Sequence, residues 1–184
     1  MDDVPFRSMV FSLATERDIP LLRQLAERIW WAAYTDLLSP EQIGHMLGWM
    51  YSEEALTRDL EAGVRYELFN VEGQSVGYLA TSFHAATRHV ELHKLYLLPE
   101  LQGRGFGQAM LRHAISDAIA QGAGRLQLRV NRRNHRALRA YGRAGFQITG
   151  EVCQDIGGGF VMDDLVMTRE LGPEPEAGQR SADR

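Results

Sequence analysis

A glycine-rich segment near the middle of the chain has the residue types and the spacing of an anion-binding loop. Gln102 is followed by Gly103, Gly105 and Gly107, after a stretch typical of a strand and before one typical of a helix. Glycines let a backbone approach a ligand closely, and the first amides of a helix, together with its dipole, favour an anion at that place. A pyrophosphate fits this description. A glycine-rich turn that merely precedes a helix is the plain alternative.

Two common nucleotide-binding motifs do not fit this loop. No Gly-Lys-Ser/Thr sequence follows it, which excludes the Walker phosphate loop. The dinucleotide fingerprint is incomplete, because Gln108 stands where its third glycine belongs. That fingerprint also follows an early first strand, whereas several elements are predicted before this loop.

Two side chains suited to proton transfer precede the loop. Glu91 and His93 stand two residues apart on a predicted strand, so we expect their side chains on the same face. Carboxylates and imidazoles are common general bases. An exposed strand carboxylate and a packed histidine remain the alternatives.

The elements that position these residues follow from hydrophobic periodicity and from start and stop signals. Leu21, Leu25 and Ile29 recur at helical spacing, and Ser39-Pro40-Glu41-Gln42 has the residues of a capped helix start. The predicted strands are 9–13, 66–71, 76–83, 89–98, 126–130, 146–156 and 161–171, and the predicted helices begin near residues 18, 39 and 52 and cover 108–121 and 137–144. This order predicts an α+β fold with a central strand-loop-helix unit.

Length and composition favour one globular domain. The 184 residues suit a single unit, which we place at residues 1–171, and residues 172–184 are expected to be disordered because they lack large apolar side chains. The formal net charge of -4 offers no basic face for nucleic acid. The one cysteine, Cys153, excludes an internal disulfide and a thiolate metal site.

Targeting signals are also missing from the sequence. The segment that begins at Met1 is acidic and lacks the pattern of a secretory signal, and no apolar run approaches the ~20 residues of a membrane span. We therefore expect a cytoplasmic location and no membrane partner.

Two segments together resemble the signature motifs of the GCN5-related N-acetyltransferase (GNAT) superfamily. The first is 95–107, and the second consists of Asn134, Ala137, Tyr141, Gly145 and Phe146. They occur in the order and spacing of that superfamily, and the resemblance covers nearly the whole domain. The chain looks most like the bacterial small-molecule acetyltransferases, including those that act on polyamines. The resemblance implies a mixed, mostly antiparallel sheet, splayed between the fourth and fifth strands, with helices on both faces and acetyl-CoA in the cleft.

The resemblance also assigns residues to acetyl-CoA. Backbone groups of Leu95, Tyr96 and Leu97 would pair with the pantetheine arm as though it were an extra strand, which is a known mode of binding. The loop would hold the pyrophosphate, with Gln102, Gly103, Arg104, Gly105, Phe106, Gly107 and Gln108 as the residues concerned. A solvated surface arginine is the alternative for Arg104. Asn134 would contact the cofactor or merely cap the following helix.

The implied reaction transfers an acetyl group directly to a primary amine in a ternary complex, and it needs a base and an acid. Tyr141, at the family's tyrosine position, is the expected acid, with a buried aromatic as the alternative. Glu91 precedes Gln102 by eleven residues, which resembles the catalytic glutamate of histone-acetylating members, so it is the expected base. His93 would relay a proton or pack. Relatives that acetylate the amino terminus of a ribosomal protein carry a glutamate where this chain has Arg129, which argues against that substrate class.

The acceptor pocket is the least determined part of the predicted site. In the resembled fold the first helices and the connection between the last two strands shape this pocket. Aromatic and acidic side chains can hold a cation, so Trp30, Tyr34 and Asp163 are the candidates, although aromatics at helical spacing are more often core. A non-catalytic acyl-CoA-binding module and an acetyltransferase of protein or peptide amino groups stay open as alternative functions. A homodimer is also left open.

Overall fold

A computed structural model of the chain describes residues 8–172, so the tail predicted to be disordered, residues 172–184, lies outside the described part except for Gly172. Within these residues, seven strands form one sheet in the order β1-β2-β3-β4-β5-β7-β6. The strands are β1 (Met9–Leu13), β2 (Arg65–Val71), β3 (Gln74–His84), β4 (His89–Leu97), β5 (Arg125–Asn131), β6 (Gln147–Asp155) and β7 (Val161–Glu170). The helices are α1 (Ile19–Tyr34), α2 (Pro40–Tyr51), α3 (Glu53–Glu61), α4 (Phe106–Ala120) and α5 (His135–Arg143).

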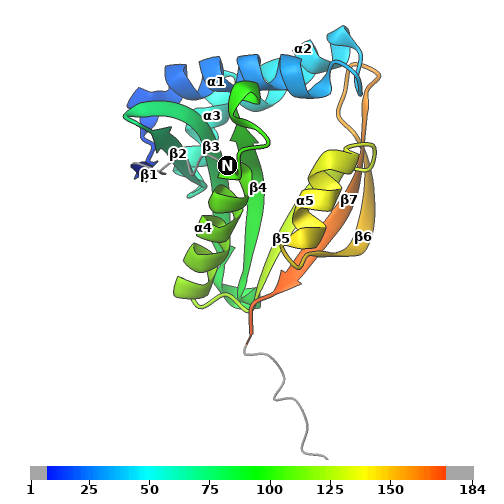
Figure 1. Ribbon diagram of the computed structural model, residues 1–184. Helices are drawn as coiled ribbons and strands as arrows, with labels where there is room; N and C mark the ends of the chain where they lie inside the picture. Colours follow the sequence, from blue (N-terminus) through cyan, green and yellow to red (C-terminus); the bar gives the residue numbers. More distant parts are fainter. Residues whose placement is uncertain (1–7, 173–184) are drawn as a thin grey trace, which may run out of the picture.

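The sheet is mixed and mostly antiparallel, because β4 and β5 form its single parallel pair among the described strands. The helices α4 and α5 cover one face, and α1 to α3 cover the other face and the upper edge (Figure 1). This arrangement confirms the predicted fold class. No helix within residues 8–172 has the length and apolar character needed to cross a membrane.

The helix starts have local causes that are visible in the structure. The Ser39 hydroxyl accepts a hydrogen bond from the Gln42 amide at 3.2 Å, and Ser52 caps α3 in the same way through the Ala55 amide at 3.1 Å. Helix α4 begins at Phe106, two residues earlier than predicted, directly after Gly105. Gly105 has a φ of 86°, a left-handed conformation that glycine adopts without strain, so the loop can turn straight into the helix.

One extra residue in β4 interrupts its pairing with β3. Ala80 pairs with Lys94 and Thr81 pairs with Leu92, which leaves His93 as a β-bulge. Leu92 packs into the core beneath α4, whereas the Lys94 ammonium lies 3.3 Å from Asp59 of α3 on the opposite side of the sheet. Bulges bend a strand and increase its twist. The bulge therefore redirects the second half of β4.

The second half of β4 is held tightly against β3. Gly77 of β3 pairs with Leu97, and a Cβ at Gly77 would lie only 2.4 Å from the Tyr96 carbonyl oxygen. Only glycine fits such a close approach. Because this edge of β4 is bound to β3, its other edge is the one that faces β5.

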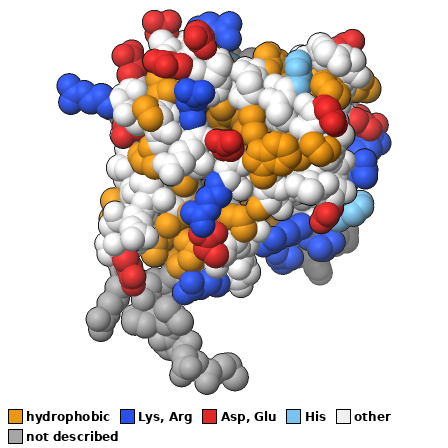
Figure 2. Space-filling view, turned by 90° about the horizontal axis from the view of Figure 1, so that it is seen from above, with side chains coloured by type: hydrophobic (Ala, Val, Ile, Leu, Met, Phe, Trp, Pro, Cys, Tyr) orange, Lys and Arg blue, Asp and Glu red, His pale blue; other side chains and the backbone are white. Residues whose placement is uncertain are grey.

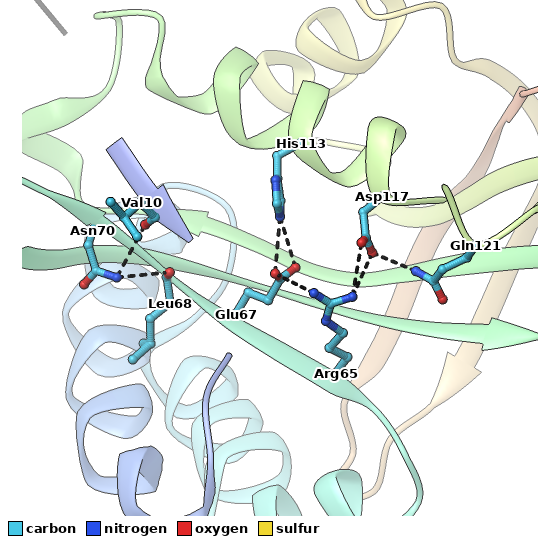
Figure 3. Close-up of polar contacts among 8 residues, drawn as sticks. All are labelled: Val10, Arg65, Glu67, Leu68, Asn70, His113, Asp117 and Gln121. Atoms are coloured by element: carbon cyan, nitrogen blue, oxygen red, sulfur yellow. Dashed lines mark hydrogen bonds and ion pairs between the residues drawn. The ribbon is translucent and has the colours of Figure 1, made fainter. Parts of the chain in front are cut away.

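A cluster of charged residues fastens α4 to β2 (Figure 3). Glu67 is almost fully buried, and its carboxylate lies 3.2 Å from His113 Nε2 and 3.0 Å from the Arg65 guanidinium. Arg65 also contacts Asp117 at 3.1 Å, and Phe11 stacks on the His113 ring at 3.6 Å between centroids. We call Arg65, Glu67, His113 and Asp117 the Glu67 cluster. It fixes the helix whose first residues follow the glycine loop.

Glu67→Gln should destabilise the fold by about 1–2 kcal/mol, because the buried side chain loses its charged hydrogen bonds to His113 and Arg65, while both partners are partly exposed and Arg65 keeps Asp117. Burial alone raises the pKa of Glu67, but the hydrogen bond and charge of His113 and the charge of Arg65 outweigh it, so the pKa lies below its usual value. A lowered folded pKa adds stability above the unfolded pKa, and this contribution is lost as pH falls through the folded pKa. Urea unfolding at several pH values should therefore show the difference between parent and variant shrinking below about pH 4.

Glu151→Gln is the matched control, since it removes a carboxylate from an ion pair with Arg132 that is largely exposed. Exposed pairs contribute little, so this variant should change the unfolding midpoint much less. Equal effects of the two variants at neutral pH would contradict the role assigned to the Glu67 cluster.

Candidate active site

The site is a cavity of about 1170 Å³ that runs through the gap between β4 and β5. The parallel pairing begins at His89 with Arg125 and ends at Leu92 with Leu128, although both strands continue beyond that point. The open ends of β4 and β5, the glycine loop, α1, α2, α5 and β7 all contribute walls. The predicted splay between the fourth and fifth strands is therefore present, and it is hollow.

The glycine loop forms one end of this cavity. Gly103, Gly105 and Gly107 line it, and Gly103 shares the left-handed conformation of Gly105 with a φ of 80°. The first hydrogen bond of α4 runs from the Ala109 amide to the Gly105 carbonyl, so the amides before Ala109 have no acceptor within the helix. An anion can accept hydrogen bonds from such amides.

Two glutamine side chains predicted at the cofactor site bridge its walls. Gln102 donates to the Leu97 carbonyl at 3.0 Å and accepts a hydrogen bond from Arg136 of α5. Gln108 donates to the Ala140 carbonyl at 3.3 Å. Gln102 thus connects the glycine loop to β4 and α5, and Gln108 connects the start of α4 to α5. Both glutamines line the cavity. Their side chains are thus engaged with the protein, and their backbone groups remain the candidates for phosphate.

Arg104 and Phe106 lie outside the cavity wall, although the sequence analysis placed them with the cofactor. Phe106 is buried and packs near Phe69, with 6.0 Å between ring centroids. The exposed Arg104 guanidinium lies 5.5 Å from the Phe106 ring. Phe106 therefore anchors the loop through its side chain.

Tyr141 and Asn134 meet the cavity from α5. Asn134 caps this helix, because its side-chain oxygen accepts a hydrogen bond from the Ala137 amide at 3.1 Å, and it also lines the cavity. Tyr141 is partly buried, and its hydroxyl forms no hydrogen bond with any residue in 8–172. Burial, followed by the neighbouring Tyr34, raises the pKa of Tyr141 well above its ordinary value. The phenol therefore keeps its proton at neutral pH and is free to donate it to a ligand.

Glu91 lies on the cavity wall at the last part of the parallel pairing. Gln127, its partner on β5, is 3.4 Å from the carboxylate. Burial raises the pKa of Glu91, and the positive charges of Arg129 and His84 offset only part of this effect. A carboxylate with a raised pKa holds a proton more firmly, which suits a general base near neutral pH.

His93 lies on the same wall of the cavity, but its imidazole binds a proton less firmly than the Glu91 carboxylate does. Its Nε2 atom is 2.8 Å from the Ser82 hydroxyl, which is also 3.2 Å from His84. The ring touches solvent, but the surrounding cavity walls and the charge of Lys94 lower the pKa of His93 to about 4. The ring is therefore neutral at pH 7. The electrostatics therefore favour Glu91 over His93 as the base.

Aromatic side chains of α1 and α2 form another wall of the cavity. Tyr34 lies 3.4 Å from the Tyr96 hydroxyl, and both residues line the cavity. Trp30 is nearly buried and donates to the Tyr51 hydroxyl at 3.3 Å, so it serves mainly the core. Viewed from above, the face over α1 and α2 has hydrophobic side chains between charged ones (Figure 2). Trp49 of α2 is 45% exposed and lines the cavity, a residue that the sequence analysis missed.

The two adjacent aspartates of β7 face different surroundings. Asp163, the predicted substrate residue, forms an ion pair with Arg132 at 2.7 Å and does not line the cavity. Asp164 is buried and lines it, and burial raises the pKa of Asp164. The acid that the structure brings near Tyr34 is therefore Asp164.

Arg129 is a second cavity residue to which the sequence analysis gave no role. Leu126, Leu128 and Val130 of β5 are buried in the core beneath α4, so the alternating residues Gln127 and Arg129 face the other way. The strand alternation is the signal that could have placed Arg129 beside Glu91.

Comparisons with known proteins agree with this geometry. Residues 21–146 match the profile of the acetyltransferase (GNAT) family. An uncharacterized N-acetyltransferase of Mycobacterium tuberculosis is 41% identical over 100 residues, which cover 54% of this chain and 63% of that protein. The chain thus matches somewhat less than two thirds of the length of this relative. The streptothricin acetyltransferase of Streptomyces lavendulae is 34% identical over 79 residues, or 43% of this chain and 42% of that protein.

Among solved structures, the PaiA N-acetyltransferase of Thermoplasma acidophilum in complex with coenzyme A has the same fold. Its TM-score is 0.74 at 22% identity, and the match covers 89% of this chain and 99% of that one. That neighbour contains coenzyme A, the carrier portion of the cofactor that the sequence analysis predicts. Because the family profile matches more than half of its length, the chain belongs to the acetyltransferase (GNAT) family.

Proposed function

We propose that the chain transfers the acetyl group of acetyl-CoA to a primary amine of a small molecule, by direct attack in a ternary complex. One observation carries this proposal. A single cavity connects the glycine loop, the open edge of β4, the tyrosine of α5 and the carboxylate of Glu91. Its volume of about 1170 Å³ exceeds the ~300–1,000 Å³ common for one ligand, as two substrates bound together require.

The chain's groups fit the parts of acetyl-CoA. Helix α4 begins with amides that lack helical acceptors, which suits the pyrophosphate. Beyond Leu92, β4 has no β5 partner, so Leu95, Tyr96 and Leu97 can offer backbone groups to the amide-containing pantetheine arm. Bound in this way, acetyl-CoA supplies an acetyl group activated as a thioester.

Glu91 and Tyr141 then have complementary roles in moving protons. Glu91 takes a proton from the acceptor ammonium, directly or through water, and the freed amine forms a carbon–nitrogen bond to the acetyl group as the carbon–sulfur bond breaks. Tyr141 donates to the departing thiolate. Because the pKa of Tyr141 is raised, it keeps its proton and stabilises the departing thiolate by a hydrogen bond, and the second proton lost by the new amide nitrogen protonates the thiolate.

Other members of the predicted site would position the acceptor. We assign its amine to Glu91 and its body to the aromatic wall of Tyr34 and Trp49. The name of the Streptomyces relative, a streptothricin acetyltransferase, supports a small-molecule acceptor. A protein or peptide acceptor and a non-catalytic acyl-CoA-binding role are the alternatives. The cytoplasmic location and the homodimer stay predictions.

Purified chain mixed with acetyl-CoA should release free thiol when amines are added, and Tyr141→Phe should reduce this turnover by roughly 10²–10⁴-fold. The variant keeps the ring and loses only the hydroxyl, so acetyl-CoA should raise its melting temperature about as much as that of the parent. Peptides with free amino groups form a second acceptor arm. Thiol release with no amine, or with peptides alone, would contradict the proposed function, and full turnover by Tyr141→Phe would return this residue to the core.

Glu91→Gln should abolish most turnover at neutral pH while leaving acetyl-CoA binding intact, because the amide keeps the shape but cannot accept a proton. With limiting acceptor, the rate of the parent should rise with pH through the ionisation of Glu91, whose raised pKa shifts this rise above the usual carboxylate range. The variant should lose this rise and recover partly at high pH, where the amine is already deprotonated.

His93→Gln is the companion variant for the base assignment. Since the pKa of His93 is lowered to about 4, its removal should have a smaller effect on turnover than Glu91→Gln. The opposite order of effects, measured as kcat/KM against pH, would transfer the role to His93.

A further inference from the structure

Arg129 is the first residue of β5 beyond the parallel pairing with β4, which ends at Leu128. It lines the cavity from the point where the two strands separate. Within residues 8–172 its guanidinium forms no hydrogen bond or ion pair, in contrast to Arg65 and Arg132, whose guanidinium groups contact carboxylates. A charged fork of donors is therefore presented to the cavity without a protein partner.

Two carboxylates lie close enough to Arg129 for its charge to affect their pKa values, but neither forms an ion pair with it. Arg129 attracts both Glu91 and Asp164, yet burial has the larger effect on each, so the pKa of each carboxyl remains raised. No carboxylate oxygen among the described residues lies within 4.0 Å of its nitrogens. The acceptor side of the cavity thus contains separate positive and negative places.

Such a separation matches an acceptor with both signs of charge. A planar guanidinium binds carboxylates through two parallel hydrogen bonds, which gives geometric selection as well as attraction. An ammonium group is attracted to Glu91 and Asp164. A polyamine, by contrast, would bring a second ammonium towards Arg129 and meet repulsion.

We propose that Arg129 binds an acidic group of the acceptor, and that the acceptor is an amino carboxylic acid whose ammonium lies at Glu91. This inference rests on the proposed function, since it names the class of amine that the same site acetylates. Arg129 then serves as the residue that determines specificity, and Glu91 keeps its role as the base.

The test compares a panel of amino acids with their primary amides and with the corresponding decarboxylated amines, and includes spermidine. The amides have lower amine pKa values and so are easier to deprotonate, which favours them in the absence of a carboxylate site. We expect the parent chain nevertheless to acetylate at least one acid with a kcat/KM roughly 10–100-fold above that of its amide.

Variants of Arg129 distinguish its binding of the acceptor carboxylate from an indirect effect of its charge on Glu91. Arg129→Gln should raise KM for the acid and reduce the ratio of acid to amide to about one, and Arg129→Lys should keep part of that ratio because charge remains without the planar fork. Arg125→Gln is the matched control, since Arg125 is an exposed residue of the same strand outside the cavity. It should keep the ratio of the parent. The melting shift with acetyl-CoA checks that each variant is folded.

The proposal is overturned if the parent prefers amides, decarboxylated amines or spermidine, or if Arg129→Gln lowers kcat/KM for acid and amide equally. The second result is what an effect through Glu91 alone would give. In both cases acetyl transfer to an amine still occurs, so the proposed function survives. Absence of thiol release with every amine would remove the proposed function and this inference together.

Discussion

Parallel pairing between β4 and β5 stops at Leu92 and Leu128, and the cavity depends on that break. An unpaired strand edge inside a protein leaves amides and carbonyls without partners, which is costly unless something else binds them. The bulge at His93 lies one residue beyond the last β4–β5 pair, and Gly77 holds the far end of β4 against β3. The sheet thereby opens at one place while its other strands remain paired.

The same bulge organises the charges around the gap. It turns Lys94 towards α3, where its ammonium contacts Asp59, and the buried positive charge helps to lower the pKa of His93. Glu91 lies before the bulge, where burial raises its pKa. The pKa values of two neighbouring side chains on one strand are thus shifted in opposite directions: burial raises that of Glu91 and lowers that of His93. The Glu67 cluster adds the second requirement, because it keeps α4 and the glycine loop in place beside the gap.

Much of this could be predicted from the sequence, for reasons that are local. Capping residues such as Ser39 and Asn134 define helix starts, and hydrophobic periodicity predicts every strand and the start of every α-helix to within two residues. Two motifs with the right spacing indicated the family, and the family implied the splayed sheet. The bulge at His93 leaves no local signal, because nothing in β4 alone reveals which residue its neighbour strand skips.

The remaining differences arise from tertiary packing. Asp163 and Asp164 are adjacent acids on one strand, and only the register of β7 against β5 decides that Asp164 meets the cavity. Gln102 and Arg136 are far apart in the sequence, so their contact could not be foreseen. The alternation of β5 does place Arg129 with Gln127, but its lack of a partner becomes visible only when the neighbouring carboxylates are positioned.

Amide hydrogen exchange with and without saturating acetyl-CoA tests the central claim most directly, namely that the gap between β4 and β5 receives the cofactor. Backbone pairing to a ligand protects the amides that it engages. We predict slower exchange in the second half of β4, from His93 to Leu97, and in the glycine loop from Gly103 to Gln108, with little change in the edge strand β6. Binding that leaves β4 and the glycine loop unprotected, or that protects β6 instead, would contradict the account.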